Sequence, residues 1–448
     1  MLLHRFHSLT RISSHCINAG RVSSIYSLTF NFRYQSRPLF QSARMSPKAN
    51  SSTAPQAIDP ELETLAEHFP VNMGDTFKEG RYEVLRKLGG GVFSNIWLVR
   101  DRDGETGFRY KALKVVTLEG TSYHEKGIYL ELEVMQAVAA LEDPEQLPIL
   151  RDNFTEKGPI GSHLCMITDI YGTNVSALRR SSTRKVLPVY MVRNIISHTV
   201  DALTQLHKLG IVHTDVKPDN LLIGTDSSDE AIEKFLDENP VEFDGEYQIE
   251  GTNYTIFKSQ PIPHIFSPES SPFQAELMST YLTDLGQAQF MNRDLTTDEF
   301  SAYALRSPEL ILRSDFGPPI DIWAVGCITF ELLVGRWLFN PEETEYYSLE
   351  DEHLARMMEI TGEKFPPQML KRSKLRDQFF NKKGKLIRFP ELDHLPLETA
   401  LRNYDVLPED EIKPAADFIL ACIHLDPRQR PSAEELQDHP WLENAFKC

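Results

Sequence analysis

The chain has 448 residues, 41% hydrophobic and 25% charged, which suggests two or three folding units with the composition of a globular protein. The net charge is −18, and residues 1–58 hold seven Lys or Arg and no Asp or Glu, so the remainder carries −25. An acidic body repels nucleic acid and membrane surfaces and attracts basic partners, so we expect no direct binding to either. The alternative is that the charge only keeps the surface solvated.

The cysteines indicate the redox state of the compartment, and the apolar runs indicate whether the chain spans a membrane. Five cysteines with no metal spacing fit a reduced compartment and buried or incidental thiols: Cys16, Cys165, Cys327, Cys422 and Cys448. The longest apolar run, 320–339, is interrupted by three charged residues, which favours a buried helix over a membrane span.

Residues 1–58 form a basic N-terminal extension that we expect to be disordered and outside the fold. Its first ~50 residues are rich in Arg and Ser and free of acids, as in a mitochondrial transit peptide. A basic tail, or sequence upstream of a start at Met45, explains them equally well. Residues 46–60 read as a linker.

A β-rich region follows. Residues 82–88, 96–99, 112–116 and 163–170 alternate or cluster as strands, separated by Gly-rich or Asp/Gly turns, and a helix is expected over 125–141. From residue 189 the period becomes helical, and further helices are expected at 320–334, 353–360, 415–423 and 432–437. The fold class is therefore α+β, a small β-rich lobe and a larger helical one.

Residues 224–280 stand apart. They hold twelve acidic residues and a Ser/Pro cluster with little periodicity, so we expect an acidic surface insert that is partly disordered.

A Gly-rich turn lies between the first two strands. Glycines at 89–91 let backbone N–H groups approach phosphate oxygens, although most such turns are only hairpins. Ser94 takes the third glycine position of Gly-x-Gly-x-x-Gly.

A lysine follows on the next strand. Ala112 leaves room for a flat base on the face where Lys114 can reach phosphates, with Lys111 where Val is usual. Glu131 is the expected carboxylate partner of Lys114, chosen over Glu133 because Met135 then falls one turn on.

The most specific segment is residues 213–220, His-Thr-Asp-Val-Lys-Pro-Asp-Asn, which resembles His-Arg-Asp-Leu-x-x-x-Asn of protein kinases. The resemblance implies that Asp215 accepts the proton of a substrate hydroxyl and that Lys217 neutralises the γ-phosphate. It also implies that Asn220 holds Mg²⁺ and that Leu222 lies beneath adenine.

Motifs further along keep the kinase order from about 82 to 442. Residues 284–286, Asp-Leu-Gly, match Asp-Phe-Gly, so that Asp284 would bind Mg²⁺. Residues 307–309, Ser-Pro-Glu, match Ala-Pro-Glu, and Glu309 needs the buried cation of Arg430. Asp321 would cap the catalytic loop. The structural residues implied are Glu309, Arg430, Asp321 and His213.

The resemblance implies a two-lobed kinase domain over 82–442, with the N-lobe at 82–170, the C-lobe at 171–442 and the insert at 224–280. The cofactors are ATP and Mg²⁺, Thr168 is the gatekeeper, and 169–171 is the hinge. The catalytic residues implied are Asp215, Lys217, Lys114 and Glu131. The metal ligands implied are Asn220 and Asp284. The ATP-binding residues implied are Leu88, Gly89, Gly90, Gly91, Val92, Phe93, Ser94, Asn95, Ile96, Ala112, Lys114, Asp169, Tyr171 and Leu222.

Several departures narrow the family. Thr214 replaces the Arg that binds a phosphorylated activation loop, and the activation segment is short, so constitutive activity is expected. With Ser94, Asp-Leu-Gly and the acidic insert, the chain resembles SR-protein kinases (SRPK) of the fungal type. That resemblance implies Arg/Ser-rich basic protein substrates, a monomer, and a place in cytoplasm and nucleus, whereas the N-terminus points to mitochondria.

An acidic stretch is the candidate substrate groove, although it could be a solvated loop: Glu342, Glu343, Glu345, Glu350, Asp351 and Glu352. Ala302, or Ser301 one step off, stands where Thr is usual, which puts substrate positioning in question. The expected function is therefore a serine/threonine protein kinase. The alternative is an ATP-binding pseudokinase scaffold for basic partners.

Overall fold

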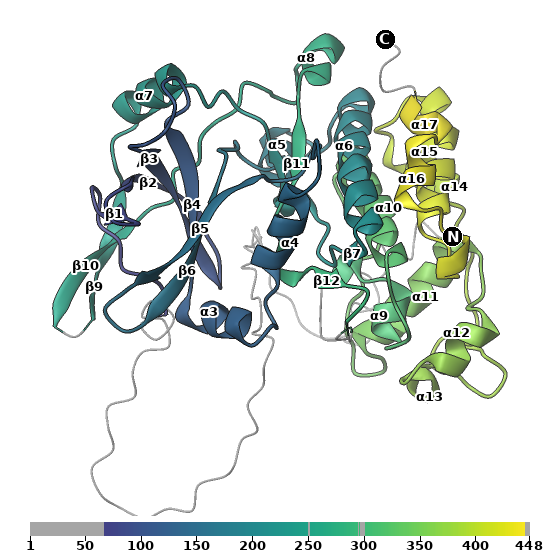
Figure 1. Cartoon of the computed structure of the whole chain (residues 1–448). Coiled ribbons are helices and arrows are strands. Elements are labelled where there is room, and N and C mark those ends of the chain that lie inside the picture. The colour runs from purple at the N-terminus through teal and green to yellow at the C-terminus, as the bar shows by residue number, and fades with distance from the viewer. Residues whose placement is uncertain (1–66, 250, 294, 296–300, 444–448) are drawn as a thin grey trace, which may run out of the picture.

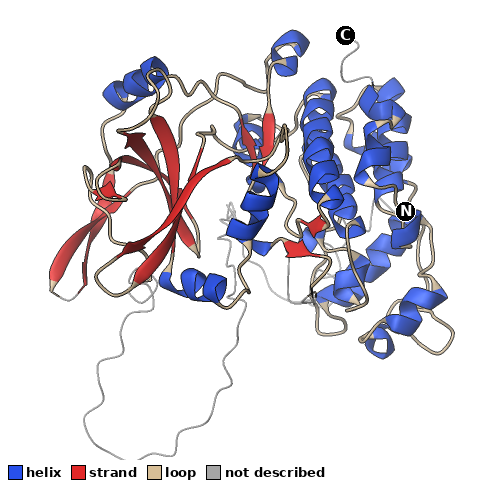
Figure 2. Ribbon diagram, viewed as in Figure 1, coloured by secondary structure: helices blue, strands red, loops and turns tan. Residues whose placement is uncertain are grey.

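The computed structural model describes residues 67–249, 251–293, 295 and 301–443. These residues form a small β-rich lobe and a larger helical lobe (Figures 1 and 2), so the expected two-lobed α+β fold is confirmed. The basic extension, 1–58, lies outside the described residues. None of the described helices is long and apolar enough to cross a lipid bilayer.

The small lobe is built on a six-stranded antiparallel sheet in the order β1-β2-β3-β4-β6-β5. β2 and β5 alternate more buried and more exposed positions, whereas β6 is buried at consecutive positions because side chains pack on both faces of the sheet there. They are β1 (Thr76–Phe77), β2 (Tyr82–Gly90), β3 (Ser94–Asp101), β4 (Tyr110–Val116), β5 (Leu150–Lys157) and β6 (Ser162–Thr168).

Two helices flank this sheet. α3 (Leu118–Glu125) is capped by the Thr117 hydroxyl, which accepts from Gly120 N, and α4 is Glu131–Ala139. The expected single helix over 125–141 is wrong at its start, because Gly127 adopts a left-handed φ of 68° and separates the two helices. α4 lies between the sheet and the large lobe (Figure 1) and buries its apolar side there.

The large lobe is organised around α6 (Val189–Lys208) and α10 (Pro319–Val334), and α10 is buried along nearly its whole length. α15 (Glu409–Cys422) approaches α10 closely at Gly326, where an added Cβ would lie 2.7 Å from Cβ of Cys422. The other helices are α5 (Val175–Ser181), α9 (Pro308–Ile311), α11 (Leu349–Thr361), α12 (Pro367–Arg372), α13 (Arg376–Phe379), α14 (Leu397–Tyr404), α16 (Ala433–Gln437) and α17 (Pro440–Glu443).

Two short strand pairs position the two segments that carry the candidate catalytic and metal-binding residues. β7 (Ile211–Val212) pairs with β12 (Gln289–Phe290), and β8 (Leu221–Ile223) pairs with β11 (Thr280–Leu282). The loop between β7 and β8 is therefore held beside the turn between β11 and β12. These two segments are 213–220 and 284–286.

The insert has more regular structure than expected. It contains α7 (Asp229–Glu238), the hairpin β9 (Phe243–Ile249) and β10 (Thr252–Phe257), and α8 (Pro272–Glu276). α7 lies against the small lobe (Figure 1). The Asp229 carboxylate accepts from Gly107 N, Arg109 N and Arg109 Nε at 2.7–2.8 Å, and Ile232 is buried with Leu98.

Candidate active site

The Gly-rich turn folds over the end of β2. Gly91 N donates to Ser94 O at 2.8 Å, and a Cβ on Gly90 would lie 2.3 Å from Asn95 Oδ1, so a larger residue there would displace the Asn95 side chain. Register pairs Ile96 with Lys114 on β4, which places the lysine beside the turn. The expected nucleotide residues are thus distributed as follows: Leu88, Gly89 and Gly90 on β2; Gly91, Val92 and Phe93 in the turn; Ser94, Asn95 and Ile96 on β3; Ala112 and Lys114 on β4.

Lys114 joins three elements. Its Nζ lies 2.6 Å from Glu131 Oε1 on α4 and 3.5 Å from Asp284 Oδ1. Burial lowers the pKa of the Lys114 ammonium, but Glu131 and Asp284 outweigh it and hold the pKa well above its ordinary value. The lysine is therefore a fixed cation at neutral pH. Glu133, the rejected alternative, lies 3.5 Å from His124 instead.

The loop 213–220 gathers three side chains. Lys217 Nζ lies 2.5 Å from Asp215 Oδ2, and Asn220 Nδ2 donates to Asp215 O at 2.9 Å and to Asp215 Oδ2 at 3.1 Å. Burial raises the pKa of the Asp215 carboxyl although Lys217 lowers it, so the carboxylate is a stronger base than an ordinary aspartate. Asp215 is positioned to accept a proton.

Buried polar contacts fix the loop. The Asp321 carboxylate accepts from His213 N at 2.8 Å and from Thr214 N at 2.9 Å. His213 Nδ1 accepts from Asp215 N, and its Nε2 lies 3.1 Å from Thr283 O. These contacts join α10 and β11 to the loop, as expected for structural roles of Asp321 and His213.

A second buried pair closes the segment after the site. Arg430 Nη1 and Nη2 lie 2.7 and 2.8 Å from the two oxygens of Glu309, and both side chains are almost wholly buried. Arg430 also stacks 4.9 Å from the Trp323 ring centroid. The bidentate geometry anchors α9 to the end of the large lobe.

The hinge lies after β6. The Asp169 carboxylate pairs with Arg151 at 2.6 Å and with Lys111 at 3.3 Å, which gives the unusual Lys111 a partner. The Tyr171 ring lies 4.6 Å from Tyr281, and Tyr281 pairs with Leu222 across β11 and β8. Leu222 thus lies near the hinge, as a residue under a bound base would.

The donor set of Asn220 and Asp284 suits a hard cation. The Asn220 amide nitrogen is bound to Asp215, which leaves its carbonyl oxygen as the atom for a metal. Desolvation raises the pKa of Asp284, but Lys114 and Lys217 outweigh it and keep the pKa below its ordinary value, and the side chain is half-exposed. Two such ligands fit Mg²⁺ that is completed by phosphate and water, and among the described residues no group of three or more His, Cys, Asp or Glu gathers as a metal cage.

Thr214 connects both ends of the activation segment. Its hydroxyl donates to Gln287 O at 2.9 Å, and its carbonyl accepts from the Ser301 hydroxyl at 2.9 Å. Thr214 itself has a left-handed φ of 69°. Ser301, not Ala302, thus supplies the hydroxyl next to the catalytic loop, and Ala302 packs against the core.

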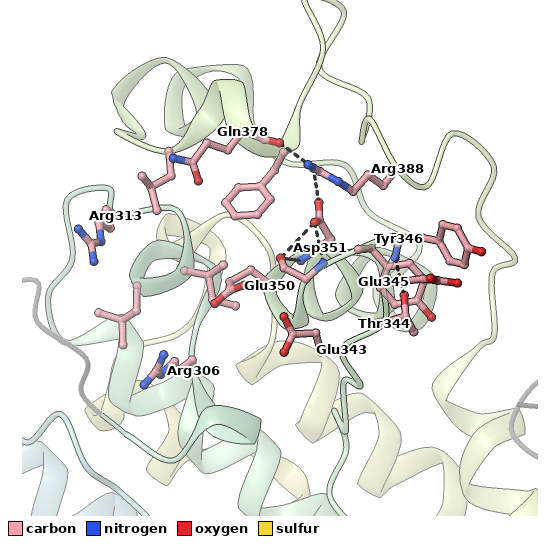
Figure 3. A pocket seen from close by; sticks show the side chains of 16 residues that line it. Arg306, Arg313, Glu343, Thr344, Glu345, Tyr346, Glu350, Asp351, Gln378 and Arg388 are labelled. Atoms are coloured by element: carbon pink, nitrogen blue, oxygen red, sulfur yellow. Dashed lines mark hydrogen bonds and ion pairs between the residues drawn. The ribbon is translucent and has the colours of Figure 1, made fainter. Parts of the chain in front are cut away.

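A cavity of about 550 Å³ lies beyond the activation segment (Figure 3). Glu343, Glu345 and Glu350 line it, with Arg306 and Arg313 on one side. The other three proposed groove acids differ. Asp351 lines the cavity but pairs with Arg388 at 3.0 Å; Glu352 is buried with Arg356 at 2.7 Å; Glu342 does not line it.

Sequence reasoning missed Tyr129. Its hydroxyl donates to Glu131 Oε2, and its ring lies against Gly286. Tyr129 belongs to no motif, and the contact joins residues far apart in the chain, so no sequence signal marked it. The role of Ser301 was foreseen only as an alternative to Ala302.

The chain is similar to known kinases over most of its length. The family model described as "Protein kinase domain" matches residues 82–236 and 274–442, which omits part of the insert. "Serine/threonine-protein kinase SRPK" of Physarum polycephalum is 29% identical and covers 84% of this chain and 88% of its own.

Two further kinases are similar to this chain over most of its length. "Protein kinase dsk1" of Schizosaccharomyces pombe is 28% identical, with 84% of this chain and 83% of that protein covered, and "SRSF protein kinase 3" of Mus musculus is 25% identical, with 84% and 88% covered. The crystal structure of another kinase domain superposes with a TM-score of 0.59 at 22% identity, covering 84% of this chain and 99% of that one, which shows the shared fold.

Proposed function

Because the chain belongs to the protein kinase domain family and is related to SR-protein kinases, we propose that it transfers the γ-phosphoryl group of ATP to Ser or Thr hydroxyls of Arg/Ser-rich basic proteins. The observation that carries the proposal is the juxtaposition of two clusters. Lys114, Glu131 and Asp284 meet at one side, and Asp215, Lys217 and Asn220 meet at the other. Phosphoryl transfer needs these parts together.

Each side chain has a defined task in this proposal. Asp215 accepts the proton of the incoming hydroxyl, and its raised pKa favours that role near neutral pH. Lys217 and Lys114 remain charged and stabilise the negative charge that develops on phosphate oxygens. Asn220 and Asp284 would hold Mg²⁺, which neutralises phosphate charge when bound.

Constitutive activity is the second part of the proposal. Kinases that carry Arg at the position of Thr214 use it to read an activating phosphate. Here Thr214 forms neutral hydrogen bonds to Gln287 and Ser301, so the ends of the segment are held without a phosphate. The chain would therefore be active as synthesised.

The substrate class rests on charge. Glu343 and Glu350 line the cavity and, within the described part of the chain, have no Lys, Arg or His partner within 4.0 Å. Arginines of a basic tract could pair with them next to the activation segment. The acidic body, at −25 outside residues 1–58, would draw such substrates by long-range attraction.

A pseudokinase scaffold is the alternative. Ala302 favours it, because the usual threonine is missing, but Ser301 supplies a hydroxyl to the same loop. The four phosphoryl-transfer side chains Lys114, Asp215, Asn220 and Asp284 are all retained and oriented, which weighs against a scaffold without turnover.

The test is γ-labelled ATP with an Arg/Ser peptide, a Lys/Ser peptide of equal charge and a neutral Ser peptide, each with wild type and Asp215→Ala. Wild type should label the Arg/Ser peptide best and exceed the variant by at least ~100-fold, because proton transfer and positioning are lost. Equal labelling of the two basic peptides would remove the Arg/Ser preference. Equal, negligible labelling by both proteins would favour the scaffold.

A further inference from the structure

Tyr129 lies where the two halves of the site meet. It precedes α4, and its hydroxyl donates to Glu131 Oε2, while the other oxygen of that carboxylate binds Lys114 at 2.6 Å. Each oxygen of the Glu131 carboxylate therefore has its own partner, Lys114 at Oε1 and Tyr129 at Oε2. A carboxylate held at both oxygens cannot rotate away from Lys114 without losing one contact.

The ring of Tyr129 also packs against Gly286, at the start of the activation segment. A Cβ added at Gly286 would lie 2.6 Å from Tyr129 Cε2 and 2.9 Å from its hydroxyl oxygen. Such distances are too short for carbon contacts, so the ring occupies the space that the missing side chain leaves. Gly286 does not have a positive φ, so glycine is needed here for this space and not for its backbone conformation.

Tyr129 keeps its proton in this place. Burial and the nearby Glu131 raise the pKa of the phenol well above its ordinary value. The hydroxyl therefore stays a hydrogen-bond donor over the working pH range. Tyr129 also packs against the apolar core that α4 shares with the large lobe.

We propose that Tyr129 is a positioning residue that couples Glu131 on α4 to the Asp284-Leu285-Gly286 turn, so that the lysine–glutamate pair and the metal-binding aspartate assemble together. This rests on the proposed kinase function and deepens it. If the turn moves, the ring of Tyr129 loses its packing on Gly286, and Glu131 then loses the hydrogen bond from the Tyr129 hydroxyl. If α4 moves, Gly286 loses the ring that packs on it.

The test compares Tyr129→Phe with a matched control, Tyr123→Phe. Both changes remove one hydroxyl that donates to a glutamate, but Tyr123 donates to the exposed Glu119 on α3, and its ring stays edge-on to Phe93 at 6.4 Å. Tyr129→Phe keeps the ring against Gly286 but leaves one oxygen of the buried Glu131 without its donor, so its melting temperature should fall by only a few degrees. We expect kcat/KM for ATP to fall about 10-fold in Tyr129→Phe and less than 2-fold in the control.

A double-mutant cycle separates positioning from general packing. If Tyr129 acts through Glu131, then Tyr129→Phe should add nothing once Glu131→Ala is present. Gly286→Ala should displace the ring and reproduce the loss of Tyr129→Phe or exceed it. The proposal is overturned if Tyr129→Phe keeps wild-type kcat/KM, if its loss is undiminished beside Glu131→Ala, or if the control loses as much.

The affinity for Mg²⁺ and a non-hydrolysable ATP analogue keeps this test separate from the proposed function. Tyr129→Phe should weaken that affinity several-fold, because Lys114 is less firmly placed for the phosphates. A wild type that binds the analogue but transfers no phosphate would refute the kinase proposal, and the affinity comparison would still decide Tyr129. Equal affinity in wild type and Tyr129→Phe would count against coupling.

Discussion

The buried Glu309–Arg430 pair gives the sharpest prediction for stability. Glu309→Ala removes both carboxylate oxygens that receive Arg430 at 2.7 and 2.8 Å. Arg430 keeps only its contacts to the carbonyls of Pro319 and His424 and to the Trp323 ring. The guanidinium is then a buried cation without its anion, which costs about 3–5 kcal/mol.

A loss of that size should be visible by thermal and urea denaturation. At ~2.1 cal/mol/K per residue, a domain of about 360 residues has an unfolding entropy of about 0.76 kcal/mol/K, so a loss of about 3–5 kcal/mol lowers Tm by roughly 4–7 °C. Replacing both partners, Glu309→Leu with Arg430→Met, should recover part of the loss, because no unpaired charge remains buried.

Asp315→Asn is the matched control for this pair. Asp315 forms an exposed ion pair with Arg372 at 3.4 Å on the same side of the lobe, and such pairs contribute little. Its Tm should be unchanged. A Glu309→Ala protein as stable as Asp315→Asn would refute the reasoning that Arg430 depends on Glu309.

Three further predictions follow from the cavity, the insert and the catalytic base. The combined change of Glu343, Glu345 and Glu350 to Gln should raise KM for an Arg/Ser peptide about 10- to 100-fold, most strongly at low salt, and leave KM for ATP unchanged in steady-state assays. Asp229→Ala should lower the free energy of unfolding by about 1–3 kcal/mol in urea titrations, because three donors lose their acceptor. Desolvation raises the pKa of Asp229, but Arg109 and the two amides outweigh it and lower the pKa, so this contribution is present above the ordinary aspartate pKa of ~4 and is lost as the pH falls below it. Because the pKa of Asp215 is raised, the acid side of the pH–rate profile should begin above pH ~4, and a profile that stays flat down to that pH would contradict its role as base.

The sequence predicted best where period and motif agree. α6 was expected because its apolar residues recur at helical spacing, and the structure begins it at Val189 as the pattern indicates. The segments 213–220 and 284–286 were assigned to one site because both resemble kinase motifs, and the β7–β12 and β8–β11 pairs hold them side by side. Local signals sufficed for both.

The sequence failed where distant contacts decide. The acidic residues of 224–280 suggested a partly disordered surface insert, but α7 is amphipathic, Asp229 is bound by the backbone of the small lobe, and Ile232 is buried there. α3 has no apolar face, so periodicity could not find it; the Thr117 cap starts it. The sequence also held no sign of the role of Tyr129, because its contact with Gly286 joins residues of different lobes that are far apart in the chain.

Phosphate transfer by Asp215→Asn tests the central claim most directly. Asparagine has the size of aspartate but cannot accept a proton, so the fold and nucleotide affinity should persist while transfer to serine in an Arg/Ser peptide falls at least ~100-fold. Phosphoserine should be measured by mass spectrometry for wild type and variant at equal nucleotide occupancy. A variant that phosphorylates serine at the wild-type rate would contradict the assignment of Asp215 as the catalytic base and, with it, the account of how this site works.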